Sequence, residues 1–175
     1  MAVVLLAMIL LPRAARAEGA AAAAARKQAT EMYQAFVRGD LETFVGYMHP
    51  KITDMMSGKE KAIETIQKTM AAAAAQGLTP TKATAAPVQQ LVEVAPAKLQ
   101  AIIPADVIMS SKDAEVRQRS YLLGFSSDAG KTWKFVDTGS GGADALRKIF
   151  PECSPALKIP PRAKPEVVRR GVSAH

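Results

Sequence analysis

The first part of the chain spaces its apolar residues with the period of an α-helix. After an alanine-rich stretch, apolar side chains recur on one face, which predicts a helix over residues 20–38 that ends at Gly39. Asp40 then caps a second, shorter helix, as aspartate commonly does at a helix start. His49 precedes Pro50 and ends this second helix, because a residue before proline disfavours the α-helical conformation.

A third helix is predicted from a capping box, in which Ser57 and Glu60 stand three positions apart. This helix is expected to run to about Gln76, with Gly77 as its stop. Residues 51–56, KITDMM, are expected to form a short extended segment ahead of it.

Beyond the third helix the pattern becomes that of β-strands, rich in β-branched and aromatic residues and broken by turn formers. Four strands are predicted, followed by a short helix over residues 143–150; the strands lie near residues 80–94, 98–109, 116–126 and 132–138. Runs of strands after runs of helices indicate an α+β fold rather than βαβ units. We therefore expect three N-terminal helices packed on a curved antiparallel sheet of about four long strands, plus a short C-terminal helix.

Residues 126–135, SSDAGKTWKF, fit the pattern S-x-D-x-G-x-T-W, which resembles the Asp box of sialidases and related β-propellers. No second S-x-D-x-G occurs in the 175 residues, whereas a propeller repeats its blades at a fixed period. The stretch is therefore interpreted as a β-hairpin turn. In such a turn Asp128 would accept bonds from nearby backbone N–H groups, Gly130 would take a positive φ, and Trp133 would pack over the loop.

Residues 1–17 have the form of a secretory signal peptide, with a short apolar run and an A-x-A ending at Ala15 and Ala17. The apolar run is shorter than the roughly 20 residues of a membrane span, so no transmembrane segment is expected after cleavage before Glu18. The protein is then exported, periplasmic or secreted, with one domain over residues 18–157. A retained amphipathic N-terminal anchor is the alternative.

The formal net charge of +7 belongs mostly to the two ends of the chain. Two arginines in the leader and a balance of +4 in residues 158–175 leave the domain at about +1, which gives no electrostatic footprint for nucleic acid. The tail mixes proline and arginine without apolar periodicity and is predicted to be disordered. Cys153 is the only cysteine, so packing rather than an internal disulfide must stabilise the domain.

The order of the elements is similar to that of the nuclear transport factor two-like (SnoaL-like) superfamily, whose members fold helices over a curved sheet to form a cone. The resemblance covers residues 20–138 and rests on YQAFVRGDLETFVGYMHPKI followed by SGKEKAIETI. The superfamily's corner, break and helix start fall here at Gly39, Asp40, Pro50 and Gly58. Isomerases, dehydratases, transport adaptors and exported domains without assigned activity share the fold, so the fold does not choose among them.

The resemblance implies candidate catalytic residues, because enzymatic members use a carboxylate or a His/Asp pair in the cone beside a tyrosine that donates to an oxyanion. The candidates here are Asp54, His49, Tyr33 and Tyr47. The alternatives are structural: His49 as a helix-end residue that interacts with free carbonyls, and Asp54 as a solvated edge residue. No metal or cofactor is expected, since the two histidines and one cysteine lack zinc spacing and no phosphate-binding loop occurs.

The methionines and aromatic residues of the helices indicate instead a soft apolar pocket. Ligand contacts are predicted from Tyr33, Phe36, Phe44, Met48, Met55 and Trp133, and the methionine supply includes Met32, Met56 and Met70. The leading hypothesis is an exported, non-enzymatic domain that binds a small apolar ligand or a protein partner in or around the cone cavity. A small lyase or isomerase is the alternative.

A homodimer formed through the sheet is a third hypothesis. Residues 116–125, VRQRSYLLGF, would be the interface strand, and their alternation places Tyr121, Leu123 and Phe125 on one face and Leu122 on the other.

Overall fold

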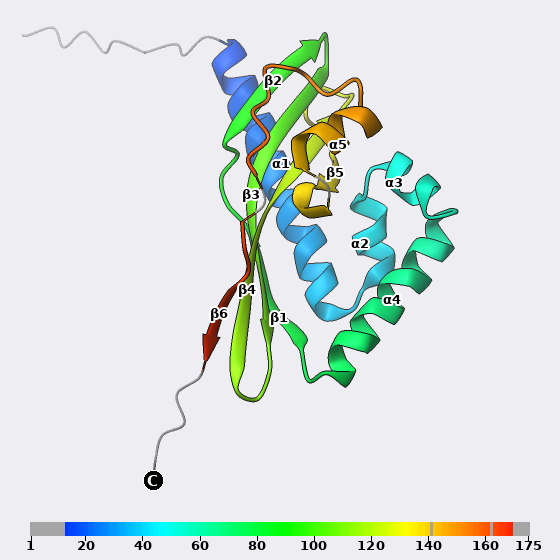
Figure 1. Ribbon diagram of the computed structural model, residues 1–175. Helices are drawn as coiled ribbons and strands as arrows, with labels where there is room; N and C mark the ends of the chain where they lie inside the picture. The colour runs from blue at the N-terminus through cyan, green and yellow to red at the C-terminus, as the bar shows by residue number, and fades with distance from the viewer. Residues whose placement is uncertain (1–12, 141, 162, 170–175) are drawn as a thin grey trace, which may run out of the picture.

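The computed structural model describes residues 13–140, 142–161 and 163–169, and in this part of the chain helices pack on an antiparallel sheet of six strands (Figure 1). The elements in chain order are α1 (Arg13–Arg38), α2 (Leu41–Tyr47), α3 (Pro50–Met55), α4 (Lys59–Ala75), β1 (Thr79–Ala85), β2 (Gln90–Ala95), β3 (Lys98–Ser110), β4 (Ala114–Ser126), β5 (Lys134–Asp137), the 3-10 turn Thr138–Ser140, α5 (Gly142–Ile149) and β6 (Glu166–Arg169). The predicted α+β class with an antiparallel sheet is confirmed.

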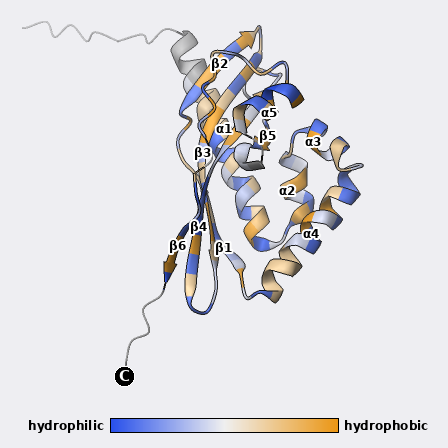
Figure 2. Ribbon diagram, viewed as in Figure 1, coloured by the Kyte–Doolittle hydropathy of each residue, from blue (hydrophilic) through white to orange (hydrophobic). Residues whose placement is uncertain are grey.

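The long hairpin β3–β4 is the centre of the sheet, and each of these strands has 13 residues. β1 and β2 pair with successive halves of β3, while β5 and β6 pair with opposite ends of β4. Bands of hydrophobic and hydrophilic positions along these strands are visible in Figure 2. The predicted strand over residues 80–94 is wrong in its extent, since it is divided into β1 and β2. The chain leaves the ladder between them at Pro87, which has no N–H to donate.

Within the described residues, four helices rather than the predicted three precede the sheet. The additional one is α3, which occupies most of the segment predicted to be extended. Pro50 stands in its first turn and His49 is its N-cap. Proline suits that position because its φ is already helical and its missing N–H would have no helical partner there.

The predicted capping box at Ser57 is also wrong. α4 begins at Lys59 with Gly58 as N-cap, and Ser57 has a φ of 67°. An N-cap residue normally has extended dihedrals, whereas Ser57 makes the left-handed corner between α3 and α4 and its side chain is not placed for capping. Gly58, with a φ of 104°, completes that corner.

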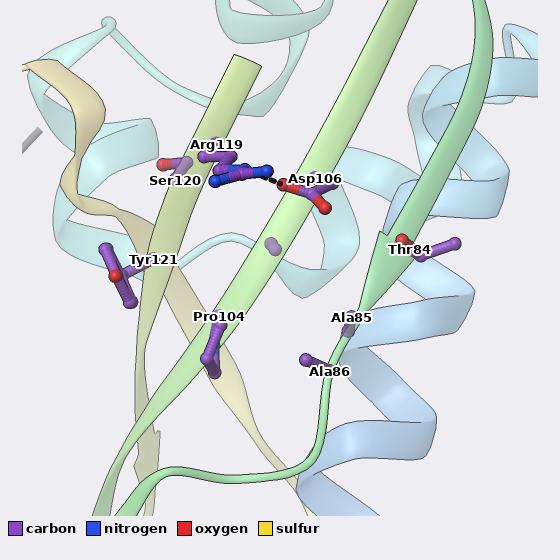
Figure 3. Close-up of a pocket in the computed structure, with 9 residues that line it drawn as sticks. Thr84, Ala85, Ala86, Pro104, Asp106, Arg119, Ser120 and Tyr121 are labelled. Carbon is purple, nitrogen blue, oxygen red and sulfur yellow. Dashed lines mark ion pairs between the residues drawn. The ribbon is translucent and has the colours of Figure 1, made fainter. Parts of the chain in front are cut away.

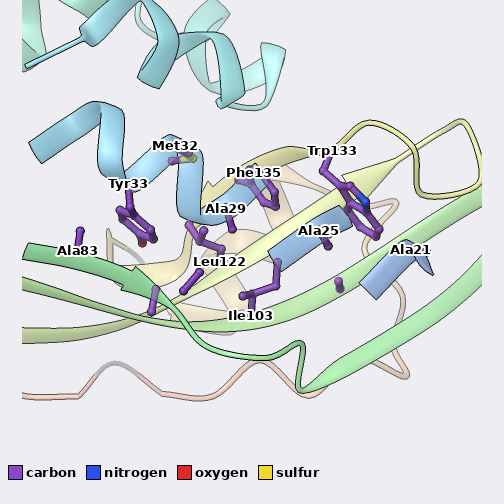
Figure 4. Packing of buried hydrophobic residues seen from close by; sticks show 13 residues of the cluster. Ala21, Ala25, Ala29, Met32, Tyr33, Ala83, Ile103, Leu122, Trp133 and Phe135 are labelled. Carbon is purple, nitrogen blue, oxygen red and sulfur yellow. The ribbon is translucent and has the colours of Figure 1, made fainter. Parts of the chain in front are cut away.

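α1 packs against one face of the sheet through alanines spaced four residues apart (Figure 4). Ala21, Ala25 and Ala29 are buried there, and their small side chains allow the helix backbone to lie close to the strands. Larger side chains complete this core from the sheet and from the turn before β5, among them Ile103, Leu122, Phe135 and Trp133.

The opposite face of the sheet is covered by α5 and the segment that follows it. Leu146 and Phe150 are buried against Leu123 of β4, and Cys153 is buried beside them. Burial also raises the pKa of the Cys153 thiol, which keeps it in its neutral form. At this end of β4, the face of the sheet that carries Leu123 is covered by α5 and the segment that follows it. This part of the predicted dimer interface is therefore not accessible to a second copy.

The SSDAGKTWKF stretch turns the chain between β4 and β5, as predicted. Asp128 Oδ1 accepts hydrogen bonds from the backbone N–H groups of Lys131 (3.1 Å) and Thr132 (2.9 Å). Gly130 has a φ of 83°, and its carbonyl accepts a hydrogen bond from the Trp133 indole at 2.9 Å. The single Asp box is thus a self-contained hairpin turn, and the predicted roles of its aspartate, glycine and tryptophan are confirmed.

The structure differs from expectation toward both ends of the chain. Residues 166–169 of the tail predicted to be disordered form β6, which pairs with residues 114–117 of β4. Residues 1–12 of the predicted signal peptide lie outside the described residues, and residues 13–17 belong to α1. Among the described helices, none has the length and apolar character needed to cross a membrane.

Candidate functional site

A largely apolar pocket of about 520 Å³ lies between the N-terminal helices, β5 and α5. Its walls are Met32 of α1; Phe44 and Met48 at α2; Ile52, Met55 and Met56 at α3; Phe135, Val136 and Asp137 of β5; and Ala145, Leu146 and Ile149 of α5. The volume falls within the range of about 300–1,000 Å³ that is usual for small-molecule sites. Five separate elements therefore contribute to this pocket.

The corner between α2 and α3 is fastened to β5, and this contact shapes one wall of the pocket. Met48 forms an isolated parallel bridge with Phe135, and the His49 N–H donates to the Phe135 carbonyl at 2.9 Å. Phe44 also packs against Phe36, with ring centroids 5.2 Å apart. These contacts hold Met48 and Phe44 toward the pocket and place Phe36 behind Phe44.

The structure places three of the six predicted ligand contacts in the pocket wall. Phe44, Met48 and Met55 line the pocket. Trp133 is only 1% exposed and packs in the core under α1, while Phe36 stacks behind Phe44. Tyr33 is buried and does not line the pocket, but it contacts the wall residue Asp137 through its hydroxyl.

Most of the remaining wall carried no local sequence signal. β5 and α5 supply half of the lining residues, and these lie about 80 to 115 positions further along the chain than the helix residues of the wall. Only the folded sheet brings the two sets together. The methionine supply was a better guide: Met32, Met48, Met55 and Met56 line the pocket, and Met70 does not.

Asp137 is the polar residue among the described residues of the pocket wall, and the sequence did not point to it. Its Oδ1 accepts hydrogen bonds from the Ser120 hydroxyl and, at 2.7 Å, from the Gly139 N–H. Its Oδ2 accepts a hydrogen bond from the Tyr33 hydroxyl at 3.2 Å. Burial, followed by the charge of Asp137, raises the pKa of Tyr33 well above its ordinary value, so this hydroxyl remains a donor.

Tyr47 has a different partner from Tyr33. Its hydroxyl donates to Glu31 Oε2 at 2.6 Å, and this hydrogen bond, with some burial, raises the pKa of Tyr47 to about 12. Tyr47 lines a separate surface depression that includes Lys27 and Lys131 and contains none of the other three catalytic candidates.

His49 acts as a helix cap, at the opposite helix end from the one expected. Its Nδ1 accepts a hydrogen bond from the Lys51 N–H at 3.2 Å, which caps the start of α3. Its ring meets Phe125 and Phe150 edge-on, with centroids 4.8 Å and 4.9 Å apart. Burial lowers the pKa of His49, so the neutral ring that accepts this hydrogen bond is favoured.

Asp54 lies exposed on α3 and does not line the apolar pocket. The four catalytic candidates thus have separate surroundings: Tyr33 meets Asp137, Tyr47 meets Glu31, His49 caps α3 and Asp54 faces solvent. The structure does not bring them together as one acid–base constellation.

A second, smaller pocket of about 280 Å³ crosses β1, β3 and β4 (Figure 3). An ion pair between Asp106 and Arg119, 3.9 Å apart, lies in it, and Arg119 also approaches Glu166 of β6 at 3.9 Å. All three side chains are exposed, and exposed pairs at this distance contribute little to stability. This pocket is more polar and more open to solvent than the one at α5.

Comparison of the chain with protein-family models, with curated proteins and with solved structures finds no match. Within the residues that the structure describes, no group of three or more His, Cys, Asp or Glu side chains is arranged to hold a metal ion.

Proposed function

We propose that this protein is a non-enzymatic binding domain that takes a small, largely apolar molecule into the pocket between α2, α3, β5 and α5. The observation that carries the proposal is the lining of that pocket. Among the described residues of its wall, all but Asp137 are apolar. Apolar walls with a single polar group are typical of sites that bind small apolar ligands.

Four methionines in the wall suit this role. The methionine side chain is unbranched and polarizable, so it can adjust to ligands of differing outline. Met55 is 61% exposed, which places an apolar side chain where the pocket meets solvent. A wall of this kind is suited to apolar ligands of several shapes rather than to one specific molecule.

In this proposal the arrangement of α1–α4 over the sheet is the cone of the nuclear transport factor two-like superfamily, and the apolar pocket is the cone's cavity. The leader over residues 1–17 exports the domain, so its ligand is met outside the cytoplasm.

One observation favours the alternative of a lyase or isomerase: a carboxylate in the pocket wall, Asp137, is bonded to a tyrosine, Tyr33. The same bond argues against the reaction. A tyrosine hydroxyl has one proton to donate, and that of Tyr33 is directed to Asp137 rather than to a developing oxyanion. Binding without catalysis therefore accounts for this geometry better.

The proposal is tested by a thermal-shift and native mass-spectrometry screen of the protein against small apolar molecules. Ala145→Phe fills the pocket from α5, and Ala72→Phe places the same ring on the exposed side of α4 as a control. A ligand at about a hundred times its Kd should stabilise the wild type and Ala72→Phe by about 2.7 kcal/mol and leave Ala145→Phe unaffected. Equal binding by both variants, or no ligand in a broad screen, would refute the proposal.

A further inference from the structure

The apolar pocket has one charged residue among its described lining residues, Asp137, and the position of that residue bears on the kind of ligand. Asp137 is exposed, whereas the neighbouring Phe135 and Val136 are buried. The carboxylate therefore lies where the pocket meets solvent, and the apolar walls formed by Phe135, Val136 and Leu146 lie deeper. A ligand that fits this gradient has an apolar body and a polar head.

The hydrogen bonds of Asp137 indicate the chemistry of that head. A carboxylate has about four acceptor positions, two on each oxygen, and when ionised it has no donor. Within the described residues, Oδ1 has two donors, Ser120 and Gly139, while Oδ2 has one, Tyr33. One acceptor position on Oδ2 is therefore left for a donor from outside the chain.

We propose, building on the binding function above, that the ligand is a cationic amphiphile: an apolar body fills the methionine-lined pocket, and an ammonium group donates a hydrogen bond to Oδ2 of Asp137. An ammonium group supplies both the donor and the opposite charge, and hydrogen bonds between charged groups are stronger than neutral ones. An alcohol of the same shape supplies only the donor. A fatty acid would bring a second carboxylate to Asp137 and be repelled.

The three fixed donors also orient Asp137 before any ligand arrives. Tyr33 is on α1, Ser120 is on β4 and Gly139 follows β5, so three parts of the fold hold one carboxylate. A group that is already oriented loses less conformational freedom on binding, which favours affinity.

The test compares decylamine, decanol and decanoate by calorimetric titration of the full chain, each below its critical micelle concentration. These probes share an alkyl chain and differ in the head group. Decylamine should bind more tightly than decanol because its hydrogen bond to Asp137 is charge-assisted. Partial screening by solvent limits this advantage to about tenfold, and decanoate should bind most weakly. Ala145→Phe should abolish binding of all three.

Asp137→Asn should remove the preference for decylamine, while Asp113→Asn, which removes an exposed aspartate from the turn between β3 and β4, should preserve it. If Asp137→Asn does not fold, the order of the three probes on the wild type still decides. Equal affinities for all three would overturn the cationic ligand and leave the apolar pocket standing. No binding of any probe would overturn the binding function itself.

Discussion

At the scale of single residues, the turn between β4 and β5 shows how a few polar atoms can fix a loop. Besides its two backbone donors, Asp128 accepts the Thr132 hydroxyl at 2.7 Å and the Ser126 hydroxyl at 2.9 Å. The bonds from Thr132, first from its backbone and then from its side chain, lower the pKa of Asp128 to about 2. The ionised carboxylate is therefore the form that stabilises the turn.

This lowered pKa predicts a pH-dependent stability that Asp128→Asn should lose. The folded-state pKa lies below the ordinary value of 3.8, so the stabilisation is fully present above about pH 4 and is lost as the pH falls through about 2. At neutral pH the variant should unfold at lower urea than the wild type, and the gap should close toward pH 2. Asp113→Asn is the matched control. A gap that is the same at pH 7 and pH 2 would contradict this role of the carboxylate.

Gly130 in the same turn has two reasons to be glycine. Its φ is positive, and a Cβ there would lie 2.3 Å from the Cβ of Ala21 on α1. Gly130→Ala should therefore cost about 2–4 kcal/mol in urea unfolding, from backbone strain and overlap together. Gly39→Ala, with a φ of 74° and open space around its Cβ, should cost only the strain of about 1–2 kcal/mol. Equal costs at both sites would show that α1 does not lie this close to the turn.

At the scale of elements, two side-chain amides attach outer segments to the sheet, and a guanidinium attaches one of these segments to α5. Gln28 of α1 donates to the Lys131 carbonyl and accepts from the Trp133 N–H. Gln100 of β3 donates to the Glu152 carbonyl at 2.8 Å and accepts from the Ser154 N–H at 2.8 Å. The guanidinium of Arg147 also reaches the carbonyls of Cys153, Ser154 and Leu157. The irregular segment after α5 is thus attached to β3 and to α5 by side-chain hydrogen bonds.

Gln100→Leu should destabilise the protein by about 1–3 kcal/mol. The Glu152 carbonyl and the Ser154 N–H would both lose their hydrogen-bond partner at a site where Gln100 is only 3% exposed. Urea unfolding measures the change, and hydrogen exchange should speed up at Ser154. Gln67→Leu on the exposed side of α4 is the control and should be nearly neutral. A neutral Gln100→Leu would mean that the segment is not attached through this amide.

The elements also show which parts of the fold the sequence could predict. Long amphipathic helices and the β3–β4–β5 order followed from periodicity and turn residues, since those signals are local. α3 was missed because Pro50 can open a helix as well as end one. β6 was missed because four exposed residues, with Val167 and Val168 at 59% and 52%, form a strand only by pairing with β4. In Figure 2 part of β6 has the hydrophobic colour.

At the scale of the whole molecule, the pocket depends on elements that are far apart in the chain. The helices supply Phe44 and the methionines, and their composition predicted a soft apolar site. Asp137 and the α5 residues reach the pocket only because β5 pairs with β4 and α5 then folds back over the sheet. Composition could therefore indicate the character of the site, while the position of the site and the presence of Asp137 in its wall required the fold.

The most direct test of the central claim is methyl NMR of the methionines during titration with decanol, a neutral probe whose binding does not depend on the charge of Asp137. We predict shifts at the four methionines of the pocket wall, Met32, Met48, Met55 and Met56, with the signal of Met70 on α4 unchanged. The shifts should be absent in Ala145→Phe. Shifts of similar size at Met70 and the four wall methionines, or no shift at any of them, would contradict an apolar binding pocket between the helices, β5 and α5.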